Sequence, residues 1–237
     1  MATILLIETA TSVCSVGLLK DDTVVALRES RVKNSHAALV TVFAEEVVKE
    51  TGISFDDIDA FAVSKGPGSY TGLRIGVSTA KGFSYATGKK LIAVNSLQSL
   101  SAGMVKAIEN EGGNPEKMLF CPMIDARRME VYTAVYNSKS EELKPTGAVI
   151  VDENSFSDLL KNNIVVFAGD GAGKCKPVLE NNANARFLQT ELYPSVKFMA
   201  PLALQRYKNN LFEDIAYFEP FYLKDFVAGI PRVKGLR

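Results

Sequence analysis

Histidine is nearly absent from this sequence, and tryptophan is absent altogether. His36 is the single histidine among 237 residues. A metal site built on two histidines is therefore excluded, and a Ser-His-Asp triad would have to use His36. Because His36 lies in the first turn of a predicted helix with a polar start, a solvated or interfacial role is more plausible for it than catalysis.

Cysteine is also scarce. Cys14, Cys121 and Cys175 are widely spaced, odd in number and form no CxxC pair. This pattern excludes a disulfide framework or a zinc ribbon. We expect three reduced thiols in the core.

The chain has no excess of either charge and no long apolar run. Lys plus Arg and Asp plus Glu both number 27, so the basic surface that binds nucleic acid unaided is not expected, and tRNA would need a partner protein. No stretch reaches the roughly 20 apolar residues that span a bilayer. Glu8 interrupts the N-terminal apolar run, which lacks the basic start of a signal peptide. We expect no membrane association and a cytoplasmic protein.

The apolar pattern of the first half predicts strands that alternate with helices, which is typical of an α/β sheet covered by helices. Three antiparallel strands come first, and two helix-strand units follow them. The expected strands are 4–8, 12–20, 23–30, 58–64 and 90–96, and the expected helices are 34–52, 71–88 and 97–108.

The second half repeats this pattern in weaker form. A charged, turn-rich segment at 109–117 marks a boundary, and the strand after it ends in Ile124 and Asp125, as the first strand ends in Ile7 and Glu8. The echo indicates a duplication that produces two lobes. The expected domains are a first lobe (1–108), a smaller second lobe (109–217) and a C-terminal segment with a basic tail (218–237).

The stretch GPGSYTGLRIG, residues 66–76, follows a predicted strand and holds four glycines. Such glycines let a backbone approach either an anion or another segment of protein. The spacing matches neither GxxxxGK[ST] nor GxGxxG, and the later GAGK fails as well, because Ala168 and Cys175 replace the Walker glycine and hydroxyl. From the residues alone, a phosphate loop and a tight structural turn both stay open.

Glu8 and Asp125 end equivalent strands. Two acids that face each other across a cleft can hold a magnesium ion through water. Equally, they can orient the backbone of the turns that follow them.

Several motifs in order resemble one family. The runs ILLIETATSVCSVGLL, GPGSYTGLRIG, IDARRMEVY and EPFYLKDF are similar to those of the TsaB (YeaZ) family, the non-catalytic subunit of the bacterial tRNA threonylcarbamoyladenosine machinery and a paralogue of TsaD. The resemblance implies two RNase H-like lobes of the actin, sugar-kinase and heat-shock ATPase (ASKHA) architecture. It also implies a TsaD-like catalytic partner that binds through two helices of the first lobe, and a TsaE-like ATPase. A homodimer would use the same two helices, and tRNA would be contacted only within the complex.

At two places this sequence differs from the motifs of catalytically active relatives, which suggests an inactive paralogue without a cofactor. TsaD-like proteins have the motif NHxxxH, whose two histidines bind the catalytic metal, and this chain has Ser96 and Leu100 in those two positions. Relatives that bind nucleotides approach the phosphates with a glycine-rich hairpin, and this chain has Ala126, Arg127 and Arg128 there. An arginine can itself contact phosphate. Peptidase activity conflicts with the single histidine. The alternative is an ATP-binding, sugar-kinase-like enzyme that uses Glu8 and Asp125 with magnesium.

The resemblance implies a partner surface on two helices of the first lobe. We expect the glycines of 66–76 to let the helix at 71–87 lie close to the helix at 35–49. A basic tail with Arg232, Lys234 and Arg237 is expected to be solvated rather than to contact tRNA. The expected interface consists of Leu39, Phe43, Val47, Gly76, Val77, Ala80 and Ser84, with His36, Arg74 and Lys81 at its rim.

Overall fold

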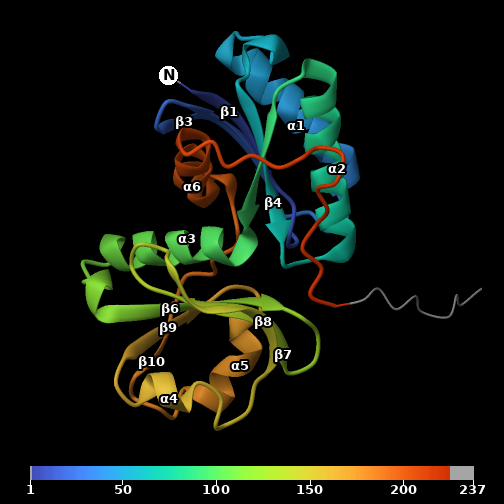
Figure 1. The fold of residues 1–237 in the computed structure, drawn as a ribbon. Coiled ribbons are helices and arrows are strands. Elements are labelled where there is room, and N and C mark those ends of the chain that lie inside the picture. Colours follow the sequence, from blue (N-terminus) through green and yellow to red (C-terminus); the bar gives the residue numbers. More distant parts are fainter. Residues whose placement is uncertain (1, 225–237) are drawn as a thin grey trace, which may run out of the picture.

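The computed structural model describes residues 2–224, whose strands form two five-stranded sheets (Figure 1). The first sheet has the order β3-β2-β1-β4-β5, with β1 (Thr3–Glu8), β2 (Cys14–Lys20), β3 (Thr23–Ser30), β4 (Ala60–Gly66) and β5 (Lys90–Asn95). The second has the order β10-β9-β6-β7-β8, with β6 (Met118–Asp125), β7 (Glu130–Tyr136), β8 (Glu142–Ile150), β9 (Ile164–Ala168) and β10 (Ala185–Phe187).

The two sheets have the same topology. In each, the first three strands are antiparallel, and the fourth strand lies parallel to the first and to the fifth. Ile7 and Ile124 each precede the last residue of the first strand of their sheet. The predicted duplication, and with it the α/β fold of two RNase H-like lobes, is confirmed.

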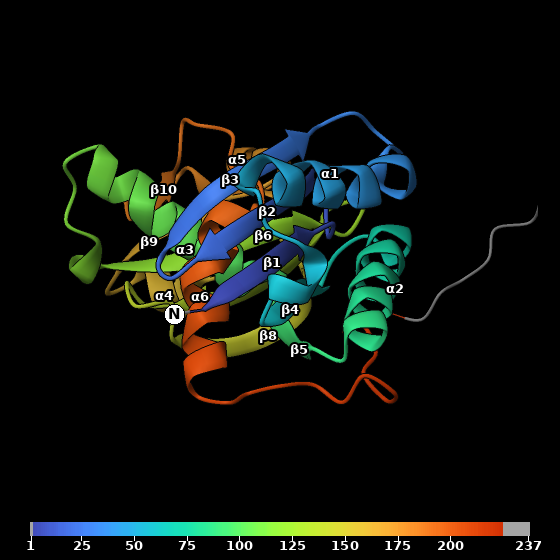
Figure 2. The ribbon, with the colours of Figure 1, turned by 90° about the horizontal axis from the view of Figure 1, so that it is seen from above.

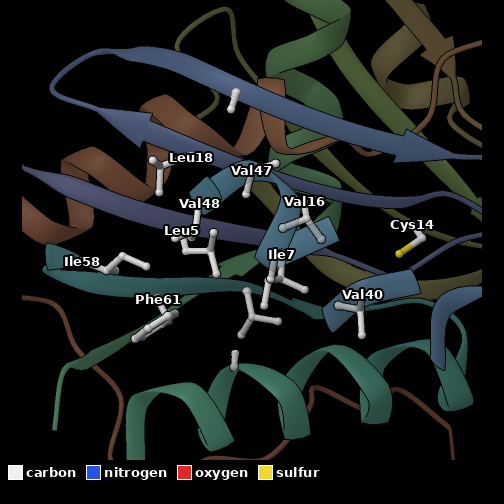
Figure 3. Close-up of a cluster of buried hydrophobic side chains, with 14 of the residues drawn as sticks. Leu5, Ile7, Cys14, Val16, Leu18, Val40, Val47, Val48, Ile58 and Phe61 are labelled. Atoms are coloured by element: carbon white, nitrogen blue, oxygen red, sulfur yellow. The ribbon is translucent and has the colours of Figure 1, made fainter. Parts of the chain in front are cut away.

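Two helices cover one face of the first sheet, and a third covers the other (Figures 1 and 2). Helix α1 (His36–Thr51) begins after Ser35 and ends at Gly52, whose φ of 69° is the left-handed conformation that glycine adopts readily. Helix α2 (Tyr70–Thr87) lies beside it. Both pack on a cluster of buried side chains (Figure 3), whose labelled members include Leu5, Ile7, Val16, Val40, Val47 and Phe61.

Two of the remaining helices pack on the sheet that the other half of the chain forms. Helix α3 (Ser96–Asn110) packs on the second sheet, whereas α6 (Val196–Lys208), from the second half, covers the free face of the first sheet. The other face of the second sheet carries α4 (Ser157–Leu160) and α5 (Ala172–Leu179). Short 3-10 turns occur at η1 (Phe55–Asp57) and η2 (Pro115–Lys117). A boundary at residue 108 divides the strands of the first sheet from those of the second, but α3 and α6 each pack on the sheet of the other half. The division into separate domains at this residue therefore stays a prediction.

Residues 209–224, which we name the C-terminal strap, run back along α2 and reach the second lobe (Figure 1). The amide of Phe221 donates to the Lys65 carbonyl at 2.7 Å, and Lys224 pairs with Glu130 of β7. The strap therefore contacts both lobes. The predicted basic tail beyond it lies outside the described residues.

The three cysteines are buried and unpaired, as expected. Burial raises the pKa of Cys14 to about 11 and that of Cys121 to about 12. Among residues 2–224, the structure has no helix with the length and apolar character needed to span a membrane.

Candidate functional site: the β1–β2 turn and the α1–α2 face

Three of the four glycines of 66–76 accommodate the turn between β1 and β2, whereas Gly66 lies against Leu73 and the Phe221 carbonyl. A Cβ atom added at Gly72 would lie 2.1 Å from the Thr9 carbonyl oxygen, and one at Gly76 would lie 2.1 Å from Thr9 Oγ1. The Thr9 hydroxyl donates to the Gly72 carbonyl at 2.8 Å. At Gly68, the added Cβ would lie 2.2 Å from the Ala10 carbonyl oxygen.

These contacts decide between the two interpretations of the stretch. The glycines approach another backbone rather than an anion. That backbone is the β1–β2 turn and not α1, so the expectation that the glycines bring α2 against the helix at 35–49 is corrected. Both helices lie on the same face of the sheet because each packs on the shared apolar cluster.

Glu8 is fully buried behind this turn. Its Oε1 accepts a hydrogen bond from the Ala10 amide at 2.6 Å, and its Oε2 has no hydrogen-bond partner among the described residues. Desolvation raises the pKa of Glu8 to about 7 against the hydrogen bonds that lower it. A proton on Oε2 is consistent with this geometry.

Asp125, the equivalent acid of the second lobe, is half exposed and already paired. Its Oδ1 accepts from the Lys174 ammonium and, at 3.0 Å, from the Arg127 amide. Its own amide donates to Asp170 Oδ1 at 2.9 Å. The carboxylate therefore fixes the turn of its own hairpin.

Glu8 and Asp125 do not fit a magnesium site. A magnesium ion needs charged oxygens open to it, but Glu8 is enclosed and its raised pKa favours the neutral acid, while Lys174 neutralises Asp125. Within residues 2–224, no group of three or more acidic, cysteine or histidine side chains is arranged to hold a metal ion. The kinase-like alternative is not favoured, and the backbone-orienting interpretation of both acids fits the observed contacts.

His36 occupies a different place from the one expected. It is buried, and its Nε2 lies 3.0 Å from the Thr11 carbonyl oxygen and 3.2 Å from that of Val13. The ring thus ties the start of α1 to the β1–β2 turn. We expected His36 at the exposed rim of the partner surface, and this expectation is wrong for the single chain. The ring points into the lobe instead, where two backbone carbonyls lie within hydrogen-bonding distance of it.

Five residues of the expected partner surface face the sheet in the single chain. They are buried because α1 and α2 turn these positions toward the core, and their part in a partner interface stays a prediction that the single chain does not test. These residues are Val47, Gly76, Val77, Ala80 and Ser84.

The outward positions of the two helices form a different surface, which we name the α1–α2 outer face. Its members are partly or fully exposed, with Val42 44% and Tyr85 84% exposed. Arg74 is its exposed cation, whereas Lys81 turns aside and donates to the Phe218 carbonyl at 2.9 Å. The face consists of Leu39, Val42 and Phe43 on α1, and Arg74, Ser78, Gly82 and Tyr85 on α2.

The positions that correspond to NHxxxH form the start of α3. The Asn95 side chain accepts from the Leu97 amide at 2.8 Å and caps the helix. Ser96 and Leu100 are fully buried, and Leu100 packs against the second sheet. These side chains stabilise the contact between helix and sheet and provide no imidazole.

Two sets of contacts in the structure were not predictable from the sequence. Lys174 and Lys224, from α5 and the strap, both pair with acids of the β6–β7 hairpin. Each is a lysine in a charged segment far from the hairpin in sequence, and no pattern identifies such a pair. Tyr222 packs against Tyr70 with the rings tilted by 34° and their centroids 4.7 Å apart, and no spacing in the sequence pairs these two residues.

Comparisons with known proteins agree with this architecture. The family model described as "TsaD: tRNA N6-adenosine threonylcarbamoyltransferase" matches residues 30–232. A Bacillus subtilis protein named "tRNA threonylcarbamoyladenosine biosynthesis protein TsaB" is 32% identical over 185 residues, which cover 76% of each chain. The Escherichia coli protein of the same name is 30% identical over 234 residues and covers 95% of this chain and 96% of its own.

A solved structure shows the same fold. The structure titled "YeaZ from Pseudomonas aeruginosa" superimposes with a TM-score of 0.78 at 24% identity, covering 94% of this chain and 100% of that one. At this identity the likeness concerns the fold alone. It agrees with the two-lobed ASKHA architecture.

Proposed function

The chain belongs to the TsaB (YeaZ) family, and on that premise we propose that it is a non-catalytic subunit that binds a TsaD-like transferase. With a TsaE-like ATPase, the complex carries out N6-threonylcarbamoylation of adenosine 37 in tRNA. The relatives are named as tRNA threonylcarbamoyladenosine biosynthesis proteins, which gives the pathway. The observation that carries the non-catalytic role is the replacement of imidazole ligands by the buried Ser96 and Leu100.

The remaining polar residues of the two lobes support this role. The single histidine is committed to two backbone carbonyls, Glu8 is enclosed, and Asp125 is paired with a lysine. Each of these groups holds a turn or a helix in place. Because these groups are engaged in structural contacts, we assign the transfer step to the TsaD-like partner.

We place the partner contact on the α1–α2 outer face. Four of its residues follow one stripe of α2 at spacings of three and four, and two of them, Ser78 and Gly82, are small and exposed. The space around Gly82 is open. A partner helix can therefore approach α2 closely at Ser78 and Gly82, and the exposed Val42 and Tyr85 offer apolar surface to it.

A reconstitution assay tests the function. The chain, a TsaD-like subunit and a TsaE-like subunit from one source are combined with tRNA, ATP and the substrates of the pathway, and modified adenosine is measured. We expect product only when the chain and the TsaD-like subunit are both present. Product from the chain alone, or the same yield without it, contradicts the proposal.

A further inference from the structure

The tip of the β6–β7 hairpin carries two arginines in an unfavourable backbone conformation. Arg127 has a φ of 72° and Arg128 a φ of 48°, and both are exposed. The left-handed conformation costs roughly 1–2 kcal/mol for a residue with a Cβ, and glycine or asparagine adopts it more readily. Glycine occupies other left-handed positions, such as Gly52 and Gly88, and Asn34, Ser140 and Phe156 are left-handed as well. The arginine pair therefore stands at a tip whose backbone conformation Asn or Gly would adopt at lower cost.

Other elements hold this hairpin in place. Lys174 of α5 pairs with Asp125 and donates to the Glu130 carbonyl at 2.7 Å. Lys224 of the strap pairs with the Glu130 carboxylate and lies 5.8 Å from the centre of the Tyr132 ring. The base of the hairpin is fixed on two sides, and its acids are already neutralised by lysines.

The two guanidinium groups themselves are uncompensated. Across residues 2–224, neither the Arg127 nor the Arg128 side chain makes an ion pair, a hydrogen bond or a ring contact, although the backbone of Arg127 takes part in the turn. Two adjacent exposed cations on a fixed base form a preorganised contact for anions. Arginine forks match phosphate oxygens in geometry and in charge.

The shape of the site indicates what kind of anion it takes. A small nucleotide needs a pocket that buries most of its surface, but the arginines stand on an exposed turn. Two cavities of the second lobe, of about 480 and 280 Å³, are lined by neither of them. A protruding tip suits a long polyanion, which it can contact at one or two phosphates.

We propose that the Arg127–Arg128 tip binds the phosphate backbone of RNA, an inference that rests on the proposed function because that function gives the chain an RNA-modifying partner. The contact adds affinity for RNA in the assembled complex. It carries no sequence information, because it reaches phosphates and no bases. The competing occupant is an acidic segment of a partner protein.

The test measures binding of a fluorescent anticodon stem-loop RNA by the full chain alone and by its complex with the TsaD-like subunit, over a salt series. Arg127→Gln with Arg128→Gln is compared with wild type. A matched control, Arg206→Gln with Lys208→Gln, removes the same charge from α6. We expect the hairpin variant to lose affinity by at least about tenfold and the salt slope to fall by about 1.4, for two lost phosphate contacts.

A second variant separates binding from folding. Arg127→Asn with Arg128→Gly gives the tip the residues that its backbone prefers, so we expect its unfolding midpoint to rise by about 2–4 °C while RNA binding falls. Loss of binding in a more stable protein cannot come from misfolding.

Several results overturn the proposal. These are unchanged RNA affinity in both hairpin variants, an equal loss in the α6 control, or loss of TsaD-like binding with RNA affinity intact. If wild type forms no complex with the TsaD-like subunit, the proposed function has failed. In that case, no RNA binding by the chain alone, or binding that both hairpin variants leave unchanged, overturns the hairpin contact as well.

Discussion

Thr9 is the residue that Gly72 and Gly76 of α2 contact. Its carbonyl and hydroxyl occupy the space where side chains at positions 72 and 76 would lie. Replacing Gly72 with Ala places a methyl group 2.1 Å from the Thr9 carbonyl oxygen. Because that oxygen belongs to the backbone, α2 must shift, and we expect a loss of about 3 kcal/mol or more in the free energy of unfolding, measured by urea titration.

Gly82 provides the matched control on the same helix. It is exposed and has no atom within 4 Å of an added Cβ. Gly82→Ala is expected to stabilise the protein by about 0.5–1 kcal/mol, because alanine suits a helix interior better than glycine. Equal effects of the two substitutions would show that the close approach to Thr9 does not determine the role of Gly72.

Glu8 makes stability depend on pH. Burial raises the pKa of its carboxyl from 4.5 to about 7, so the folded state binds the proton more tightly than the unfolded state. The resulting stability is fully present below pH 4.5 and is lost as pH rises through 7. We expect Glu8 to lower the free energy of unfolding by about 3 kcal/mol over that range.

Glu8→Gln isolates this contribution. The amide keeps the acceptor for the Ala10 amide and cannot ionise. In urea titrations from pH 4.5 to 8, the stability of wild type relative to the variant should fall with rising pH. A difference between them that stays constant with pH would mean that Glu8 does not titrate in this range.

At the residue scale, the sequence predicted residue types better than their orientation. The burial of the cysteines follows from composition and spacing. The burial of His36 does not, because its two carbonyl partners belong to a turn more than 20 residues earlier in the chain. The sequence places helices but leaves open which side of each faces the sheet, so the burial of Val77 and Ala80 in the single chain does not follow from it.

At the scale of elements, the two lobes share their helices. Met199 of α6 packs on the first sheet, and Leu100 of α3 packs on the second. Strand patterns and the echo between Ile7 and Ile124 predicted both sheets. The exchange of helices was not predicted, because an apolar face shows that a helix is covered and does not show by which sheet.

This exchange predicts a crosswise effect of two core substitutions. Met199→Ala should speed native-state hydrogen exchange chiefly in β1 and β5, and Leu100→Ala chiefly in β6 and β9, with each losing about 2–5 kcal/mol of stability. Each substitution thus loosens the sheet that the other half of the chain supplies. Equal acceleration in both sheets by both variants would contradict the shared packing.

The whole molecule presents a two-lobed fold whose acids and histidine hold turns and helices in place. Family resemblance predicted the architecture, and the sequence alone predicted the two sheets. The α1–α2 outer face depends on the orientation of both helices, which only the structure gives. The proposed role therefore depends on whether this face binds a TsaD-like subunit.

Light scattering on the chain mixed with a TsaD-like subunit from the same source tests that role most directly. We expect a stable mixed species for wild type and for Gln205→Arg, an exposed control on α6, and none for Ser78→Arg, which places a long charged side chain on the α1–α2 outer face. A mixture that stays as separate species contradicts the account. A Ser78→Arg variant that binds as wild type does would exclude this face.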